Sequence, residues 1–317
     1  MTNIPMGADP IDPNAAGHEA GGGPGGTGDV PDLQAARPLR VDVWRRFKQN
    51  RLALVGLGFI IVILLVAIFA DFIAPYGFAE RAGSDSGSFR QGPSSDFWFG
   101  TDAIGRDVFS RLVYGARVSL RIGISATTIA LFIGLIFGSI AGFFGGFAET
   151  LIMRVTDVFL AIPYIVLAVA VAAVFGRSEN AIILVLGFTG WLGVARIVRS
   201  SFLQLKQLEY VEAATALGFS RPRIMFRHIL PNALQPIIVY GTIAIGTTIL
   251  AEAALSFLGV GPQAPTPAWG LMVADGKGDL ASASHLVFFP GAAIGLTVLS
   301  FVLVGDGLRD ALDPRLK

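Results

Sequence analysis

Six long apolar stretches alternate with polar segments along the chain, at residues 52–70, 118–144, 151–175, 181–200, 233–258 and 286–304. Each is close to the length of about 20 residues that an α-helix needs to cross the hydrocarbon of a bilayer. Three of the connecting segments are too long to be turns, namely residues 71–117, 201–232 and 259–285. The pattern predicts an all-α membrane protein with six transmembrane helices, because helices and closed barrels alone satisfy their backbone hydrogen bonds in lipid.

Two of the predicted spans carry residues that shape helix packing. Gly134, Gly138 and Gly142 follow one another at four-residue spacing, which lines one helix face with small residues for close packing. The third span begins with Arg154 and Asp157, which are three residues apart, share a helix face and can pair.

Three residues are candidates either for a translocation path or for helix packing. Pro163 lies inside the third span and predicts a kink, because proline removes a backbone hydrogen bond. Glu252 lies at membrane depth in the fifth span, where an ionisable group is costly and a functional role is the first hypothesis. It either lines the path or holds two helices together through a hydrogen bond. Asp157 is the third candidate.

The polar segments at the start of the chain differ in character. Residues 1–36 are rich in Gly, Pro, Asp and Ala, cannot bury a core, and are predicted to form a disordered tail. Residues 37–51 concentrate basic side chains directly before the first span.

The long segment at 71–117 ends in a predicted short amphipathic helix, residues 107–117, that lies on the membrane surface. Its apolar positions are expected to face inward and Arg111 to face outward. The inward residues are Val108, Leu112 and Val113.

Composition excludes several classes of protein. Charged residues make up 15% of the chain, whereas a soluble domain usually carries about 25%. The chain has no cysteine and three scattered histidines, and it contains no HExxH, no GxSxG and no GxxxxGK[ST] motif. We therefore expect no metal site, no catalytic residue and no ATP-binding P-loop in this chain, and the net charge of +1 gives no reason to expect nucleic acid as a partner.

The distribution of basic residues predicts the orientation. If both termini are cytoplasmic, 16 of the 24 Lys and Arg residues lie on the inside and 8 on the outside. The positive-inside rule therefore favours cytoplasmic termini.

The polar segment before the fifth span predicts two short helices with a hinge. Glu209–Leu217 is rich in good helix formers, and Gly218 follows where a left-handed residue would end that helix. Ser220 can cap a second, basic helix that carries Pro222 in its first turn. Pro231 is expected to stop this second helix or to begin a new one. A DNA-binding helix-turn-helix is excluded, because membrane-length apolar runs on both sides leave no soluble core to carry it.

Two motifs resemble one family of transport proteins. Glu212-Ala213-Ala214, then Gly218 and Ile229-Leu230-Pro231, all between two apolar spans, resemble the EAA loop of bacterial ABC importer permeases. The stretch FGTDAIGRDVFSRLVYGARVSL at residues 99–120 resembles the signature of the C-type subunit of dipeptide, oligopeptide and nickel permeases. The resemblance covers roughly residues 40–317.

The resemblance implies a type I ABC importer permease fold over residues 52–317, in a bacterial inner or plasma membrane. It implies that residues 209–232 form a cytoplasmic coupling loop that contacts an ATPase subunit. The residues expected to take part are Glu212, Ala213, Ala214, Gly218, Arg221, Arg223, Ile229 and Pro231.

The same family works as an assembly, so the resemblance also implies partners. These are a second homologous permease subunit, two ATPase subunits that bind ATP and Mg²⁺, and an extracytoplasmic substrate-binding protein. Because that protein delivers the substrate, the packing role is favoured for Glu252.

The predicted function is the uptake of dipeptides or oligopeptides. Nickel, glutathione or another small solute is an alternative cargo, since similar permeases carry them. An ion-coupled secondary transporter is a further alternative, but it would need several intramembrane acids and usually an internal repeat. A membrane-embedded enzyme would need a metal cluster or a Ser/His pair in the spans, which the sequence lacks.

Overall fold

The computed structural model describes residues 39–82 and 89–312. The chain divides into two units, Met1–Pro38 and Leu39–Lys317, and all of the described residues belong to the second. The predicted tail at residues 1–36 therefore lies outside the described residues.

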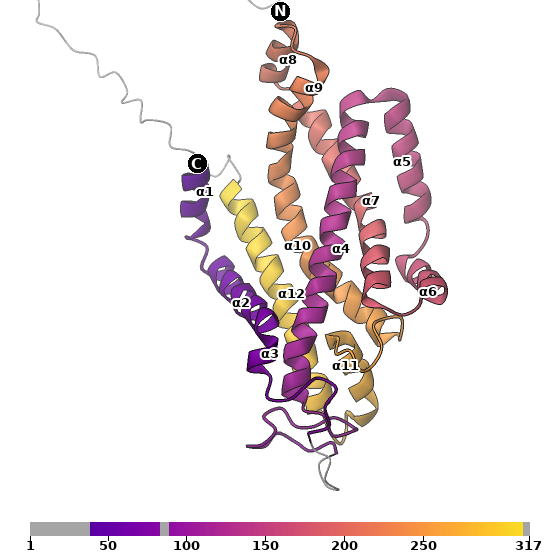
Figure 1. Ribbon diagram of the computed structural model, residues 1–317. Helices are drawn as coiled ribbons and strands as arrows, with labels where there is room; N and C mark the ends of the chain where they lie inside the picture. Colours follow the sequence, from indigo (N-terminus) through magenta and orange to yellow (C-terminus); the bar gives the residue numbers. More distant parts are fainter. Residues whose placement is uncertain (1–38, 83–88, 313–317) are drawn as a thin grey trace, which may run out of the picture. The chain divides into compact units, whose positions relative to one another are not determined.

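The described residues are helical, with no β-strand among them (Figure 1). Five of their helices are long and apolar enough to cross a membrane, and the count is six if the bent pair α5–α6 is one span. In chain order the elements are α1 (Leu39–Phe47), α2 (Arg51–Ile68), α3 (Ala70–Ile73), α4 (Val108–Phe144), α5 (Gly146–Leu160), α6 (Tyr164–Phe175), α7 (Glu179–Leu205), α8 (Glu209–Ala216), α9 (Arg221–Arg223), the π-helical turn η1 (Ile224–Ile229), α10 (Leu230–Phe257), α11 (Trp269–Gly276), the 3₁₀ turn η2 (Lys277–Asp279) and α12 (His285–Leu312).

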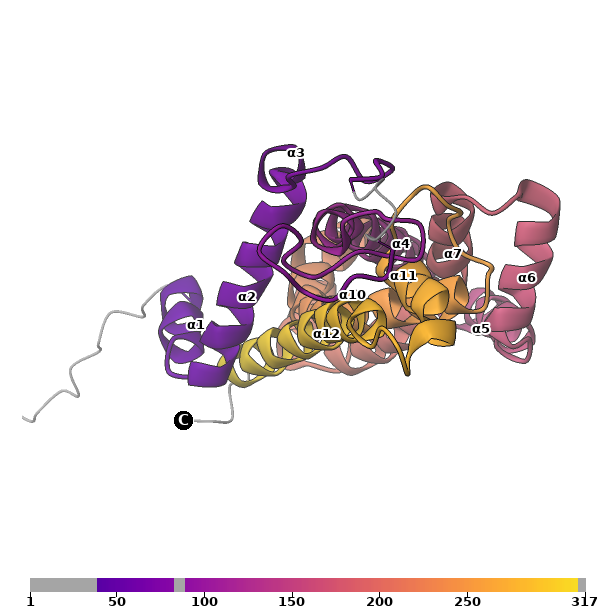
Figure 2. The same ribbon diagram turned by 90° about the horizontal axis from the view of Figure 1, so that it is seen from below.

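The described unit has two ends of different character. Helices α8 and α9 lie at one end, which we call the coupling end (Figure 1). Residues 74–82, 89–107 and 258–284 gather around α11 at the opposite end, which we call the loop end. Seen along the helices, α5 and α6 lie at one edge and α1 and α2 at the other, with α4, α7, α10 and α12 between them (Figure 2).

The glycines of α4 bring this helix into direct contact with α7. A Cβ atom built on Gly134 would lie 2.4 Å from the Cβ of Val194, and one on Gly142 would lie 2.6 Å from the Cβ of Phe202. The predicted close packing by these glycines is confirmed.

The predicted third span is not one helix. It is divided into α5 and α6, which are bent by 81° relative to each other. Pro163 occupies the N-cap position of α6 with an extended backbone, φ −57° and ψ 126°, and proline cannot donate the hydrogen bond that would continue α5. The kink predicted at Pro163 is present as a complete break. The connection between the predicted spans at 118–144 and 151–175 is also shorter than expected, since α5 already begins at Gly146.

Helix α4 starts ten residues earlier than the predicted second span. The side chain of Asp107 caps it, accepting a hydrogen bond of 2.8 Å from the backbone N–H of Ser110. The separate amphipathic helix predicted at residues 107–117 is therefore wrong, because these residues form the first turns of α4.

The expectation that Arg111 faces outward is also wrong. Its side chain is buried, with 2% exposed. One terminal nitrogen donates to the backbone carbonyls of Phe78 and Pro265, and its Nε lies 3.7 Å from a carboxylate oxygen of Asp102. The loop end folds over α4 and supplies acceptors that a sequence pattern does not reveal.

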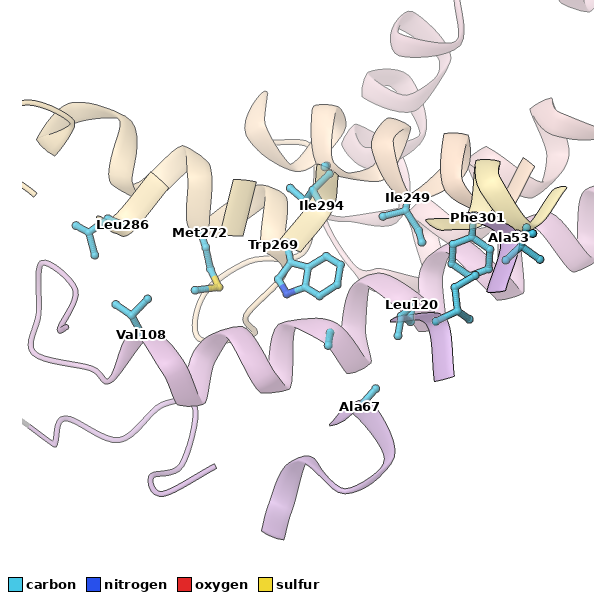
Figure 3. Close-up of a cluster of buried hydrophobic side chains, with 14 of the residues drawn as sticks. Ala53, Ala67, Val108, Leu120, Ile249, Trp269, Met272, Leu286, Ile294 and Phe301 are labelled. Atoms are coloured by element: carbon cyan, nitrogen blue, oxygen red, sulfur yellow. The ribbon is translucent and has the colours of Figure 1, made fainter. Parts of the chain in front are cut away.

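The largest apolar cluster joins α2, α4, α10, α11 and α12. Trp269, the first residue of α11, is fully buried at its centre, with Met272 and Leu120 close by (Figure 3). This packing fixes the loop end to the helices that lead away from it.

Candidate coupling site and substrate path

Helix α8 presents one face to solvent and attaches through the other. Val211 and Ala214 are buried against the residues of η1 and α10, whereas Glu212 and Ala213 are exposed. The three residues of the EAA motif, Glu212, Ala213 and Ala214, therefore differ in exposure. Glu212 and Ala213 are available to a partner, and Ala214 anchors the helix.

A tight turn ends α8 at Gly218. The residue has φ +77°, the left-handed conformation that the sequence predicted. Its N–H donates to the carbonyl of Thr215 at 3.0 Å, and the N–H of Phe219 donates to the carbonyl of Ala214 at 3.1 Å. These two bonds form a Schellman motif, which satisfies helix-end carbonyls and requires a residue without a Cβ penalty.

The second helix of the coupling segment is not separate from the fifth span. Residues Arg221–Phe257 form one continuous helix of membrane length. Ser220 is at its N-cap position, as predicted, although its side chain makes no capping hydrogen bond. Pro231 does not stop the helix, which corrects one half of the prediction. It stands in the first turn of α10, as the other half expected, but α10 follows the preceding turn without a break.

The π-helical turn η1 explains how Pro231 is accommodated. Proline in a helix lacks an N–H and clashes with the carbonyl four residues earlier, here that of Arg227. In η1 the N–H of Leu230 bonds instead to the carbonyl of Met225, five residues earlier. The widened turn relieves the clash, so the coupling segment and α10 remain one body.

Polar and aromatic contacts tie this turn to α8. The carbonyl of His228 accepts hydrogen bonds from Asn232 Nδ2 at 2.8 Å and from the Tyr210 hydroxyl at 3.3 Å. The ring of Phe219 stacks on that of His228, and the guanidinium of Arg223 lies 4.5 Å from the centre of the Phe219 ring. These contacts join α8 to the start of α10.

The remaining predicted coupling residues also divide by exposure. Arg221, Arg223 and Pro231 are exposed, and Ile229 is fully buried beneath them. Leu217 and Phe226, which sequence reasoning missed, are 74% and 61% exposed. The sequence could have shown this, because both are large apolar residues within the polar segment 209–232. Contact of this surface with an ATPase stays a prediction.

A cavity of about 430 Å³ lies between the break in α5–α6 and helices α4, α7 and α10. Pro163 lines it, so the break between α5 and α6 lies at the wall of this space. Its polar wall is made of hydroxyl groups, from Thr127, Tyr164, Thr189, Tyr240, Thr247 and Thr248. Uncharged hydroxyls can donate and accept hydrogen bonds, which suits a polar solute without selecting one charge.

Asp157 lies outside this cavity and pairs across helices. Its carboxylate is 2.5 Å from the guanidinium of Arg196 on α7, so the predicted pairing with Arg154 is wrong. Glu149 and Arg199 form a second ion pair between α5 and α7. Both ion pairs therefore connect α5 to α7.

Glu252 is fully buried and does not line the cavity either. One carboxylate oxygen accepts a hydrogen bond of 2.6 Å from Ser256, and the other accepts one of 3.2 Å from Ser119 on α4. Of the two roles left open for Glu252, these contacts fit the one in which it holds two helices together.

The comparisons with known proteins agree with this architecture. Residues 134–317 match the family model described as "binding-protein-dependent transport system inner membrane component". Residues 39–93 match the N-terminal transmembrane domain of oligopeptide transport permease C. The chain belongs to the binding-protein-dependent transport permeases.

Named relatives cover nearly the whole chain. A dipeptide transport system permease protein of Alkalihalophilus pseudofirmus is 46% identical, over 89% of this chain and 92% of its own length. A glutathione transport system permease protein of Pectobacterium atrosepticum is 41% identical, over 91% of this chain and 95% of its own.

A solved structure supports the fold. The permease chain from inward-facing crystals of the MetNI methionine ABC transporter superimposes with a TM-score of 0.54 at 21% identity, over 64% of this chain and 97% of that one. The described residues thus have the type I ABC importer permease fold. The protein is a multi-pass permease subunit of an ABC importer in the bacterial inner membrane, and its relatives are transport subunits. Permeases of this family work with an ATPase and a binding protein.

Proposed function

We propose that this permease takes up dipeptides or short oligopeptides. The proposal is supported by relatives named for dipeptide and glutathione transport, since glutathione is itself a small peptide. It is also supported by the hydroxyl-lined cavity of about 430 Å³ next to Pro163. We propose that substrate passes this cavity after delivery by an extracytoplasmic binding protein.

The coupling end faces the cytoplasm in this proposal, and the loop end faces outward. The excess of basic residues on the side of α1, α8 and α9 supports this orientation, because such residues favour the cytoplasmic side. Both chain termini are then cytoplasmic.

The single observation that carries the proposed mechanism is the continuity of the coupling segment with α10. Exposed Glu212 and Leu217 form a surface on α8 and its turn, and α8 is bonded to a helix that crosses the whole protein. When the ATPase subunits close around ATP, the force on this surface tilts α10. The cavity then opens alternately to each side, as a shift between two populated states.

We propose the full assembly as this chain, a second homologous permease, two ATPase subunits and the binding protein. ATP and Mg²⁺ bind to the ATPase subunits, and this chain is not catalytic. Nucleic acid has no part in it.

Substituting Glu212→Lys tests the coupling surface. Because Glu212 is exposed, the variant is expected to insert and assemble normally. It is expected to lose most peptide uptake in proteoliposomes that contain the whole complex, with ATP supplied on the side of the ATPase subunits. The matched control is Glu80→Lys, which reverses an exposed acid at the loop end. Normal uptake by Glu212→Lys would contradict the coupling assignment.

A pull-down in mild detergent from the native membrane tests the assembly and the substrate together. Mass spectrometry is expected to identify a second permease, P-loop ATPases and a binding protein that retains a peptide. A chain that comes out alone even after crosslinking would exclude the proposed assembly. A binding protein that retains nickel or another solute would replace the peptide and leave the assembly intact.

A further inference from the structure

Helix α10 connects the two ends of the protein. It continues from the coupling segment at Arg221 and ends at Phe257, where the chain enters the loop end. Glu252 is five residues from this terminus. Whatever Glu252 binds is therefore joined directly to the far end of the coupling helix.

Glu252 starts a chain of hydrogen bonds that passes through three elements. The Ser119 hydroxyl of α4 donates to Glu252 at 3.2 Å and accepts from the backbone N–H of Trp269 at 3.3 Å. The carboxylate acts as an acceptor toward both neighbouring serines, so it directs the Ser119 proton toward itself and leaves the oxygen lone pairs to Trp269. The hydrogen bonds therefore link α10 to α4 and α4 to α11.

The first turn of α11, at Trp269 and Gly270, is packed tightly against α4 and α10. Trp269 is fully buried and donates its indole N–H to the carbonyl of Leu112 at 3.0 Å. A Cβ atom on Gly115 would lie 2.8 Å from the indole, and one on Gly270 would lie 2.5 Å from the backbone of Ala253. Figure 3 shows the indole over α4 within the apolar cluster.

Simple packing does not require an acid here. Glu252 is fully buried, and among the described residues it forms no ion pair. Burying such a group costs free energy that an apolar residue of similar size would not. What the carboxylate adds is two directed acceptor positions, one of which fixes the bridge to α11.

We propose that Glu252 is a positioning residue for transport, which joins α10, α4 and the first turn of α11 into one moving body. A displacement of α10 then reaches the loop end instead of stopping inside the helix bundle. The inference rests on the proposed function, in which ATPase subunits act on the coupling segment and substrate enters at the loop end.

The test uses the whole complex in lipid nanodiscs, with ATP and vanadate as the probe. Since the chain has no cysteine, a single reporter is introduced as Gln207→Cys beside α8 or as Leu280→Cys at the loop end, both at exposed positions. The rate of maleimide labelling is compared with and without ATP and vanadate. The same complex without the introduced cysteine gives the background from the partner subunits.

Ser119→Ala removes the bridge, and Ser139→Ala is its matched control. Both serines are buried on α4, but the Ser139 hydroxyl has no hydrogen-bond partner among the described residues. Glu252→Ala is not used, because it would leave a buried cavity and is expected to impair assembly.

In the parent and in Ser139→Ala, both reporters are expected to change their labelling rate. In Ser119→Ala the reporter at position 207 is expected to respond normally and the one at 280 to respond less, because the Trp269–Leu112 bond and the Gly270–Ala253 contact remain. An undiminished response at 280, or an equal loss in both alanine variants, would overturn the inference. A parent in which only position 207 responds would overturn it and leave the proposed function standing. A parent in which position 207 does not respond would instead contradict the proposed function.

Discussion

Gly138 of α4 lies against Val198 of α7 with no room for a side chain between them. A Cβ atom on Gly138 would stand 2.6 Å from the Cβ of Val198 and 2.6 Å from the carbonyl oxygen of Ala195. Backbone atoms cannot move aside as a flexible side chain can. The separation of these two helices is therefore set by glycine.

Gly138→Leu is expected to destabilise the protein, because overpacking a tight contact costs about 1–3 kcal/mol. Thermal unfolding of the purified complex, followed by size-exclusion chromatography, should show a lower midpoint and a lower yield. The control is Gly58→Leu on α2, where no atom of the chain lies within 4 Å of an added Cβ. Equal behaviour of the two variants would contradict the packing role of Gly138.

The turn at Gly218 gives a prediction about backbone conformation rather than space. No atom lies within 4 Å of a Cβ built there, so the cost of a side chain comes from φ +77°. For Gly218→Ala this cost is about 1–2 kcal/mol, and Gly218→Asn should be milder, since Asn tolerates the left-handed region. Hydrogen exchange at the Phe219 amide, which closes the turn, should rise in the order Gly, Asn, Ala.

Gly259 provides the control for that series. It has φ +78° and equally open space, but it lies at the loop end. Gly259→Ala should carry a similar backbone strain and leave ATP-dependent uptake intact, whereas Gly218→Ala should lower uptake. If both variants lowered uptake alike, strain in general and not the coupling turn would be responsible.

The ion pair between Asp157 and Arg196 is expected to contribute little stability. Both side chains are about half exposed, at 50% and 49%, and such pairs contribute about 0–1 kcal/mol. A double-mutant cycle with Asp157→Asn and Arg196→Gln, measured by thermal unfolding, should give a small positive coupling. The cycle with Arg154→Gln should give none. Coupling to Arg154 instead of Arg196 would show that the cross-helix pair is wrong.

Filling the cavity should block transport without affecting assembly. Thr248 lines the space of about 430 Å³, so Thr248→Phe places a ring in the proposed path. Uptake is expected to fall by about tenfold or more, equivalent to about 1.4 kcal/mol. Thr242→Phe, on the same helix but away from the cavity, should transport normally. Equal uptake by both variants would remove this cavity from the path.

The apolar runs, the glycine spacing in α4 and the left-handed Gly218 were readable from the sequence. All of them are local: helix length follows from apolar length, and the left-handed turn follows from a residue without a Cβ. The EAA motif and the FGTD stretch indicated the family, which the comparisons confirm.

Tertiary structure alone decided the contacts between segments distant in sequence. Arg111 is buried because the loop end supplies carbonyls to it, and Asp157 pairs with Arg196 because α7 passes beside α5. The partners of Glu252 come from α4 and, through Ser119, from α11. The sequence pattern shows helical periodicity. It does not show which distant residue becomes the hydrogen-bond partner of a buried polar group.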